Sequence, residues 1–178
     1  MEKEAKGKAW KFGDNLDVDY QIFPFQYVLQ NMGGVSLDKL VHHVMEVVNP
    51  EFATNIKKGD FVVAGRNFGH GKPHQQGAEC FKLLGASAVI ADSIAPLFFK
   101  GMLYYGLPAL VGEGISAKIR QGDELEVNLE TGEIRNLSTG ETLKVTPVVT
   151  PQHPLFPVME AGGQIAYIKK KVEALQKA

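Results

Sequence analysis

Residues 61–91 decide the fold of this chain, and they read FVVAGRNFGHGKPHQQGAECFKLLGASAVIA. Two short and continuous apolar runs, Phe61–Ala64 and Ala88–Ala91, are typical of strands that are buried on both faces. Between these runs lie a glycine-rich loop, residues 65–77, and a helical stretch, Ala78–Leu84. The order strand, loop, helix, strand predicts one unit of a parallel sheet.

Strands and helices continue to alternate after this unit. Residues 94–105 read as a helix closed by Gly106, and residues 109–111 read as a third buried strand. This alternation predicts a small parallel sheet with right-handed crossovers. Over residues 124–145 the apolar period changes to two, which predicts a β-meander. A helix over residues 165–177 is expected near the end of the chain.

The N-terminal third of the chain shows two patterns. Residues 10–30 read as extended, with a break at Pro24. Over residues 37–48 the apolar positions recur at helical spacing, which predicts a helix with Ser36 as its N-cap. We therefore expect one α/β domain over residues 1–178, with a parallel sheet, flanking helices and a meander.

The composition excludes several classes of partner. The chain has 178 residues, of which 44% are hydrophobic and 22% charged, and this lies in the globular range. The formal charge is −1, from 19 Lys and Arg against 20 Asp and Glu, so no basic surface for nucleic acid is expected. No apolar run approaches the ~20 residues of a membrane span, and the charged N-terminus does not resemble a secretory signal. We expect no membrane association and a cytoplasmic location.

The cysteine and histidine content limits metal chemistry. A single cysteine, Cys80, excludes a disulfide framework. It also excludes an iron–sulfur cluster or structural zinc held by this chain alone, because such sites need about three or four Cys or His ligands. His70 and His74 are four residues apart, but Gly71 and Pro73 argue against a shared helix face. We predict no metal site here, and Cys80 is expected to be a small buried residue.

The glycine-rich loop is the first candidate site, because ligands of open α/β sheets bind beyond the carboxyl ends of the strands. Its spacing does not fit a P-loop, which requires Ser or Thr where Pro73 stands. It does not fit a dinucleotide fingerprint either, since that requires Gly where His74 stands. The loop gathers several donors that favour an anion such as a carboxylate: Arg66, Asn67, His70, Lys72 and His74. The alternative is a tight turn whose glycines serve only packing.

An acidic segment near the N-terminus is a second candidate. Asp14, Asp17 and Asp19 lie within six residues. They indicate either a polar turn between strands or an acidic turn that binds a metal.

Motifs spread over nearly the whole chain resemble one family. They are Trp10–Asp19, Asn49–Ala53, Val63–Gly69, Gly106–Pro108, Gly122–Val127, Glu130–Gly132 and Glu160–Gly163. On these motifs the chain resembles the small subunits of the aconitase-like hydro-lyases, above all that of isopropylmalate isomerase (3-isopropylmalate dehydratase). The resemblance implies a swivelling β/β/α domain, which agrees with the order of elements predicted above.

The resemblance also implies a function by assembly. A large subunit would hold a 4Fe–4S cluster on cysteine ligands, and the small subunit would close over it without binding a cofactor itself. The implied reaction is the reversible dehydration of a small hydroxy di- or tricarboxylic acid, such as a substituted malate. The open iron of the cluster would act as a Lewis acid on the hydroxyl group, while a base removes the neighbouring proton.

The resemblance is weakest at the residues that would perform the chemistry. By position, Asp19 matches the family aspartate that orients a histidine of the large subunit. After Gly71 the family reads Ser-Ser-Arg-Glu-His, with the first serine as base and the arginine gripping a substrate carboxylate. Here residues 72–76 read Lys-Pro-His-Gln-Gln, so every position differs. We expect Lys72 to serve as base or carboxylate clamp, and His74 to hold a carboxylate more weakly than a guanidinium would.

The predicted site therefore combines Lys72 and Asp19 as catalytic residues with a set of substrate-binding residues. That set is Arg66, Asn67, Phe68, Gly69, His70, Gly71, Pro73 and His74. Two alternatives remain: a non-catalytic regulatory or assembly subunit that kept the scaffold, and a free-standing anion-binding domain. Substrate selectivity is expected to depend on Pro24–Val35 and on the partner.

Overall fold

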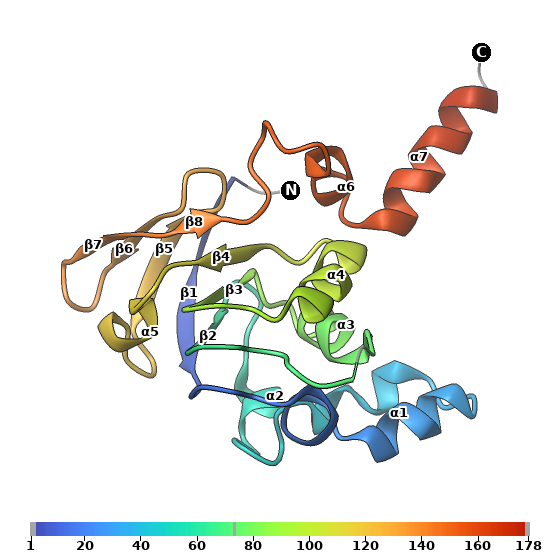
Figure 1. Ribbon diagram of the computed structural model, residues 1–178, viewed down its shortest axis with the longest axis horizontal. Helices are drawn as coiled ribbons and strands as arrows, with labels where there is room; N and C mark the ends of the chain where they lie inside the picture. The colour runs from blue at the N-terminus through green and yellow to red at the C-terminus, as the bar shows by residue number, and fades with distance from the viewer. Residues whose placement is uncertain (1–2, 73, 177–178) are drawn as a thin grey trace.

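A mixed β-sheet runs through the centre of the structure (Figure 1), a computed structural model that describes residues 3–72 and 74–176. In these ranges the sheet has eight strands in the order β7-β6-β5-β1-β2-β3-β4-β8. Strands β1 to β4 are parallel neighbours, whereas β5, β6, β7 and β8 pair antiparallel. The strands are β1 (Glu4–Lys11), β2 (Phe61–Ala64), β3 (Ala88–Ala91), β4 (Ala109–Val111), β5 (Glu124–Asn128), β6 (Glu133–Asn136), β7 (Thr142–Lys144) and β8 (Thr146–Pro147).

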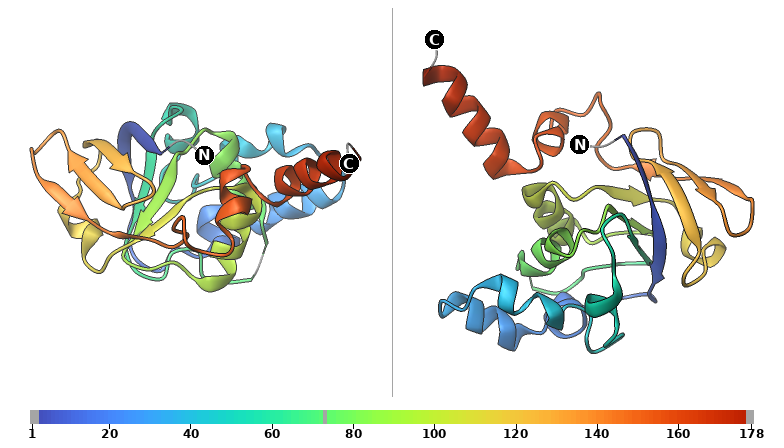
Figure 2. Two further views of the ribbon diagram at one scale, coloured as in Figure 1. Left: turned by 90° about the horizontal axis from the view of Figure 1, so that it is seen from above. Right: turned by 180° about the vertical axis from the view of Figure 1, so that it is seen from behind.

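Helices cover one face of the parallel strands, and the meander with α5 lies on the other (Figures 1 and 2). The α-helices are α1 (Phe25–Met32), α2 (Phe52–Asn55), α3 (Gln76–Leu83), α4 (Pro96–Tyr105), α5 (Ile115–Lys118), α6 (Phe156–Glu160) and α7 (Gln164–Gln176). A π-helical turn, η1 (Val18–Ile22), and two 3-10 turns, η2 (Leu37–Lys39) and η3 (Val41–His43), complete the helical segments described. Among the described residues, no helix has both the length and the apolar character needed to cross a bilayer.

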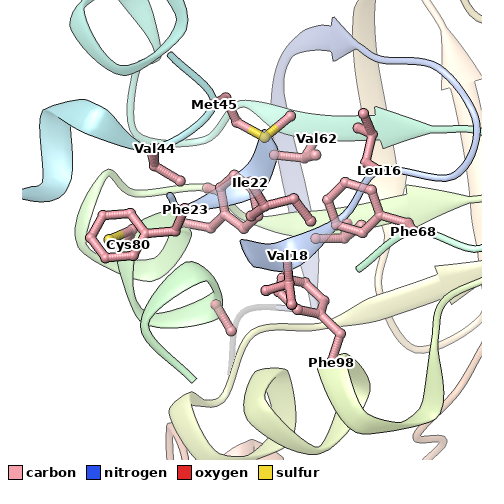
Figure 3. Packing of buried hydrophobic residues seen from close by; sticks show 14 of the residues in the cluster. Leu16, Val18, Ile22, Phe23, Val44, Met45, Val62, Phe68, Cys80 and Phe98 are labelled. Carbon is pink, nitrogen blue, oxygen red and sulfur yellow. The ribbon is translucent and has the colours of Figure 1, made fainter. Parts of the chain in front are cut away.

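The parallel strands separate two hydrophobic cores. Alternate side chains of one strand point to opposite faces, so Val62 and Ala64 face the helical core while Phe61 and Val63 face the meander. Figure 3 shows the helical core, where side chains of η1, β2, α3 and α4 pack together. Burial on both faces explains why these strands are continuously apolar rather than alternating.

The predictions for the middle of the chain are confirmed. Strands occupy residues 61–64, 88–91 and 109–111, and helices α3 and α4 end next to Gly85 and Gly106. Strands β5 to β7 form the predicted meander. The final helix, α7, is also present, and beyond Tyr167 its described residues are exposed. The spacing of apolar residues and the glycines that end helices are sufficient to predict these elements from the sequence.

The predicted helix over residues 37–48 is wrong. Two short 3-10 turns stand there, and Ser36 makes no capping hydrogen bond to them. Met45 has a φ of 62°, and its N–H donates to the carbonyl oxygen of Ile22 at 2.7 Å. That tertiary bond breaks the helical path, while Leu40 and Val44 remain buried as their spacing suggested.

The extended interpretation of residues 10–30 holds only at its start, where β1 runs to Lys11. Val18–Ile22 forms the π-helical turn because Asp17 accepts hydrogen bonds from two N–H groups at its start. Pro24 then precedes α1 as its N-cap residue rather than interrupting a strand.

We expect Gly7→Ala to lower the free energy of unfolding by about 1–3 kcal/mol. A Cβ at residue 7 would overlap the carbonyl oxygen of Gly59 and lie 2.7 Å from the backbone nitrogen of Asp60, neither of which has room to move. Gly13→Ala is the matched control because its Cβ would meet nothing within 4 Å. Urea unfolding of both variants measures the difference, and equal stabilities would show that β1 does not approach residues 59–60 this closely.

Candidate functional site

Two loops that leave the carboxyl ends of β1 and β2 continue side by side beyond the sheet. Their backbones are joined by four hydrogen bonds of 2.7–3.1 Å: Gly65 N to Gly13 O, Asn15 N to Arg66 O, Gly69 N to Leu16 O and Val18 N to His70 O. The parallel register of β1 and β2, in which Lys11 pairs with Val63, sets this arrangement. The acidic segment and the glycine-rich loop are therefore neighbours in space.

The first part of the loop is anchored to the segments that follow β1 and β3 at the carboxyl ends of the parallel strands. The N–H of Arg66 donates to Oδ1 of Asp14 at 2.8 Å, and the N–H of Asn67 donates to Oγ of Ser93 at 2.8 Å. The side-chain amide of Asn67 also donates to Oδ1 of Asn15 at 3.2 Å. The Arg66 side chain is 74% exposed, so its guanidinium is accessible to an anion even though it lies 3.6 Å from Asp14.

Phe68 anchors the middle of the loop in the helical core (Figure 3). It is fully buried, and its ring packs edge-on against Phe98 with centroids 5.3 Å apart. The side chain of this predicted binding residue therefore points away from the site.

His70 and Asp17 join the loop to the acidic turn. Nε2 of His70 lies 2.8 Å from the carbonyl oxygen of Asn15, and Nδ1 lies 3.5 Å from Oδ2 of Asp17. Oδ1 of Asp17 accepts hydrogen bonds from the N–H groups of Asp19 and Tyr20 at 2.7 and 3.1 Å. These bonds favour the polar-turn alternative for the acidic segment. Within the described ranges, no group of three or more His, Cys, Asp or Glu side chains is placed to hold a metal.

The tip of the loop folds over Asp19. Oδ2 of Asp19 accepts the backbone N–H of Lys72 at 3.0 Å. Gly71 makes this approach possible, because its φ is 112° and a Cβ there would lie 2.8 Å from Oδ2 of Asp17. Lys72 itself is exposed, with Nζ 6.0 Å from the centroid of the Phe25 ring.

His74 points inward, toward Asp19. Its Nε2 lies 3.4 Å from Oδ1 of Asp19, and the two side chains are only 8% and 10% exposed. Burial lowers the pKa of His74, because desolvation disfavours the imidazolium, and the attraction of Asp19 only partly offsets this effect.

Cys80 lies on α3, behind the loop, and is fully buried. Burial raises the pKa of its thiol well above the usual range. A buried neutral thiol is neither a nucleophile nor a metal ligand.

The structure thus gathers part of the predicted site and separates the rest. Asp19, His70, Gly71, Lys72 and His74 meet at the loop tip. Arg66 and Asn67 lie at the start of the loop, bonded to Asp14 and Ser93, while Phe68 lies in the core and the N–H of Gly69 donates to the carbonyl oxygen of Leu16. Pro73 lies outside the described residues.

Two further residues lie next to this cluster, and neither is among the predicted catalytic or substrate-binding residues. Phe25 begins α1 beside both Lys72 and His74, with its ring centroid 6.5 Å from that of His74. Asp17 faces His70. The acidic pattern of residues 14–19 signals Asp17, whereas nothing in the local sequence signals Phe25.

Full-length relatives place this chain in a family, although no family model matches it. The chain is 42% identical over 176 residues to the isopropylmalate/citramalate isomerase small subunit of Methanocaldococcus jannaschii, covering 99% of this chain and 100% of that protein. It is 36% identical over 173 residues to the methanogen homoaconitase small subunit of Methanothermobacter thermautotrophicus, covering 97% and 95%. The crystal structure of 3-isopropylmalate dehydratase from M. jannaschii matches with a TM-score of 0.86 and 32% sequence identity, covering 98% of each chain.

The chain belongs to the small subunits of the aconitase-like hydro-lyases. The predicted resemblance and the predicted fold class are both confirmed. As a hydro-lyase small subunit, the chain is part of an enzyme complex.

We expect the free energy of unfolding to fall as the pH drops below about 6.5, the ordinary pKa of histidine. The folded state holds His74 with a lowered pKa, so in this window the unfolded chain binds more protons and acid favours unfolding. Above that pH the imidazole is neutral in both states and the loss vanishes. His74→Gln should flatten this part of the profile, and His42→Gln, at an exposed position, should not. Denaturant unfolding between pH 5 and 8 measures the slopes; identical slopes for the wild type and His74→Gln would contradict the burial of His74.

Proposed function

We propose that this small subunit contributes its loop tip to the reversible dehydration of a substituted malate by a two-subunit hydro-lyase. The observation that carries the proposal is the full-length likeness to small subunits named for isopropylmalate, citramalate and homoaconitase chemistry. The cationic and N–H groups at the carboxyl edge of the sheet suit a substrate that carries carboxylates.

A large subunit is the partner that a small subunit requires, and we place the 4Fe–4S cluster there. The described residues of this chain do not fit such a cluster, because Cys80 is buried and the chain has no other cysteine. When bound to its own subunit, a cluster of this kind supplies a Lewis acid for the substrate hydroxyl group.

Lys72 is the substrate-facing cation of the loop tip. Asp19 fixes the backbone N–H of Lys72, so the point from which the side chain leaves the loop is set. The side chain itself is exposed, so its ammonium group can reach a substrate carboxylate. A compact ammonium charge holds a carboxylate as a point charge, without the two-pronged geometry of arginine. We therefore assign it as the carboxylate clamp. A role as base requires the large subunit to bury the amine.

The exposed face of α1 borders the same cluster. Phe25, Leu29 and Met32 are 41%, 54% and 75% exposed, and Phe25 lies beside Lys72. We place the substituent of the malate, or the adjoining part of the large subunit, against this apolar face, in line with the expected role of Pro24–Val35 in selectivity.

Lys72→Ala, reconstituted with its large subunit, should lower kcat/KM by about 10- to 100-fold, the cost of one charge-assisted hydrogen bond. Most of the loss should be in KM if Lys72 is a clamp and in kcat if it is a base. Lys144→Ala is the control, because Lys144 is an exposed lysine of β7 on the meander. Steady-state assays on isopropylmalate and dimethylmalate make the measurement.

Full activity of Lys72→Ala would remove the assigned role of Lys72, and full activity of every loop-tip variant would favour a regulatory or assembly subunit instead. Binding of a hydroxy dicarboxylate by this chain without any partner would favour the anion-binding domain. Both alternatives leave the loop outside the chemistry.

A further inference from the structure

His74 and Asp19 present three buried polar atoms that lack a hydrogen bond to any described residue. They are Nδ1 and Nε2 of His74 and Oδ1 of Asp19. An unpaired buried donor or acceptor costs about 1–3 kcal/mol, so such a group in a native site needs a reason.

Two of the three atoms face each other. Nε2 of His74 and Oδ1 of Asp19 are 3.4 Å apart, slightly beyond a good hydrogen bond, and one can donate while the other can only accept. A hydrogen bond between these two atoms would satisfy both, and the backbone carbonyl of Val18 is the other acceptor beside the ring. The charged groups around the ring favour the same arrangement, because the carboxylates of Asp17 and Asp19 attract its N–H, while the Lys72 side chain points to the surface.

We propose that His74 is a positioning residue that donates from Nε2 to Oδ1 of Asp19 and thereby holds the loop tip in its working shape. The proposal deepens the proposed function and rests on it. It withdraws His74 from the substrate and leaves Lys72 as the cation of the tip that meets a carboxylate.

His74 acts on Lys72 through the carboxylate of Asp19. Asp19 would be held by His74 at Oδ1 while its Oδ2 holds the backbone N–H of Lys72, so rotation of the carboxylate would move Lys72. The backbone adds a second link, since the N–H of His74 donates to the carbonyl oxygen of Lys72 at 3.0 Å. Loss of the imidazole therefore frees both Asp19 and the segment that carries the clamp.

The pairing of His74 with Asp19 also changes which chain supplies the histidine that faces this aspartate. The family resemblance gives the matching aspartate a histidine from the large subunit, whereas here a histidine of the same chain already faces Asp19. The aspartate is then oriented before the subunits assemble, and preorganisation of this kind reduces the ordering cost of assembly.

The test begins with the isolated full-length chain, labelled with ¹⁵N and followed by NMR through its histidine ring nitrogens. The expected result at pH 7 is a neutral His74 with the proton on Nε2. In Asp19→Asn the pKa of His74 should fall further, because the attraction of the carboxylate is lost, and the amide signal of Lys72 should shift. Asp38→Asn, which removes the same charge at an exposed site, should change neither signal.

The second part measures activity of the reconstituted enzyme. His74→Leu removes the donor and should lower kcat/KM about tenfold, whereas His74→Gln keeps an N–H at the same reach and should restore most of it. Lys72→Ala should cost less in the His74→Leu background than in the wild type, because the clamp is already displaced.

The outcomes separate this inference from the proposed function. A proton on Nδ1, or a ring signal that Asp19→Asn leaves unchanged, overturns the role of His74 whatever the enzyme assay shows. The expected NMR result together with a fully active Lys72→Ala enzyme would support the pairing and remove only the clamp. If His74→Leu does not fold, the wild-type tautomer and the Asp19→Asn comparison still decide.

Discussion

The parallel pairing of β1 with β2 is the constraint on which the rest of the structure depends. It aligns Lys11 with Val63, and backbone hydrogen bonds then continue past both strand ends, so that residues 12–18 and 65–70 leave the sheet together. Every polar contact of the candidate site forms across this junction or beside it. A displacement of this register by one residue would turn the buried side chains of the strand to the opposite face of the sheet and misalign the two loops.

Polar contacts between the acidic turn and the loop then determine the shape of the loop. The acidic turn offers carboxylates at Asp17 and Asp19, and the loop offers histidines at positions 70 and 74 with a glycine between them. Gly71 permits the close approach, and the N–H of Lys72 completes it. Lys72 and His74, which depart from the pattern that the resemblance implies, both contact Asp19.

Different side chains of the same loop serve the scaffold and the candidate site. Phe68 illustrates the division, because it stands in the middle of the candidate loop yet packs in the helical core. It anchors the loop in the core, while Lys72, further along the same loop, is exposed. The high coverage of relatives that differ in their named substrates agrees with this division.

The sequence by itself determined the strands β2, β3 and β4, the helices α3 and α4 and the meander, because buried apolar runs, glycine stops and a period of two are local signals. It also determined that the loop after β2 is the place to search. Only the tertiary structure decided that Met45 turns away from a helix to donate to Ile22, and that His74 faces Asp19 rather than solvent. Lys72 and Asp19 are 53 residues apart in the chain. The pairing of β1 with β2 brings them together, and a local sequence pattern cannot predict such a contact.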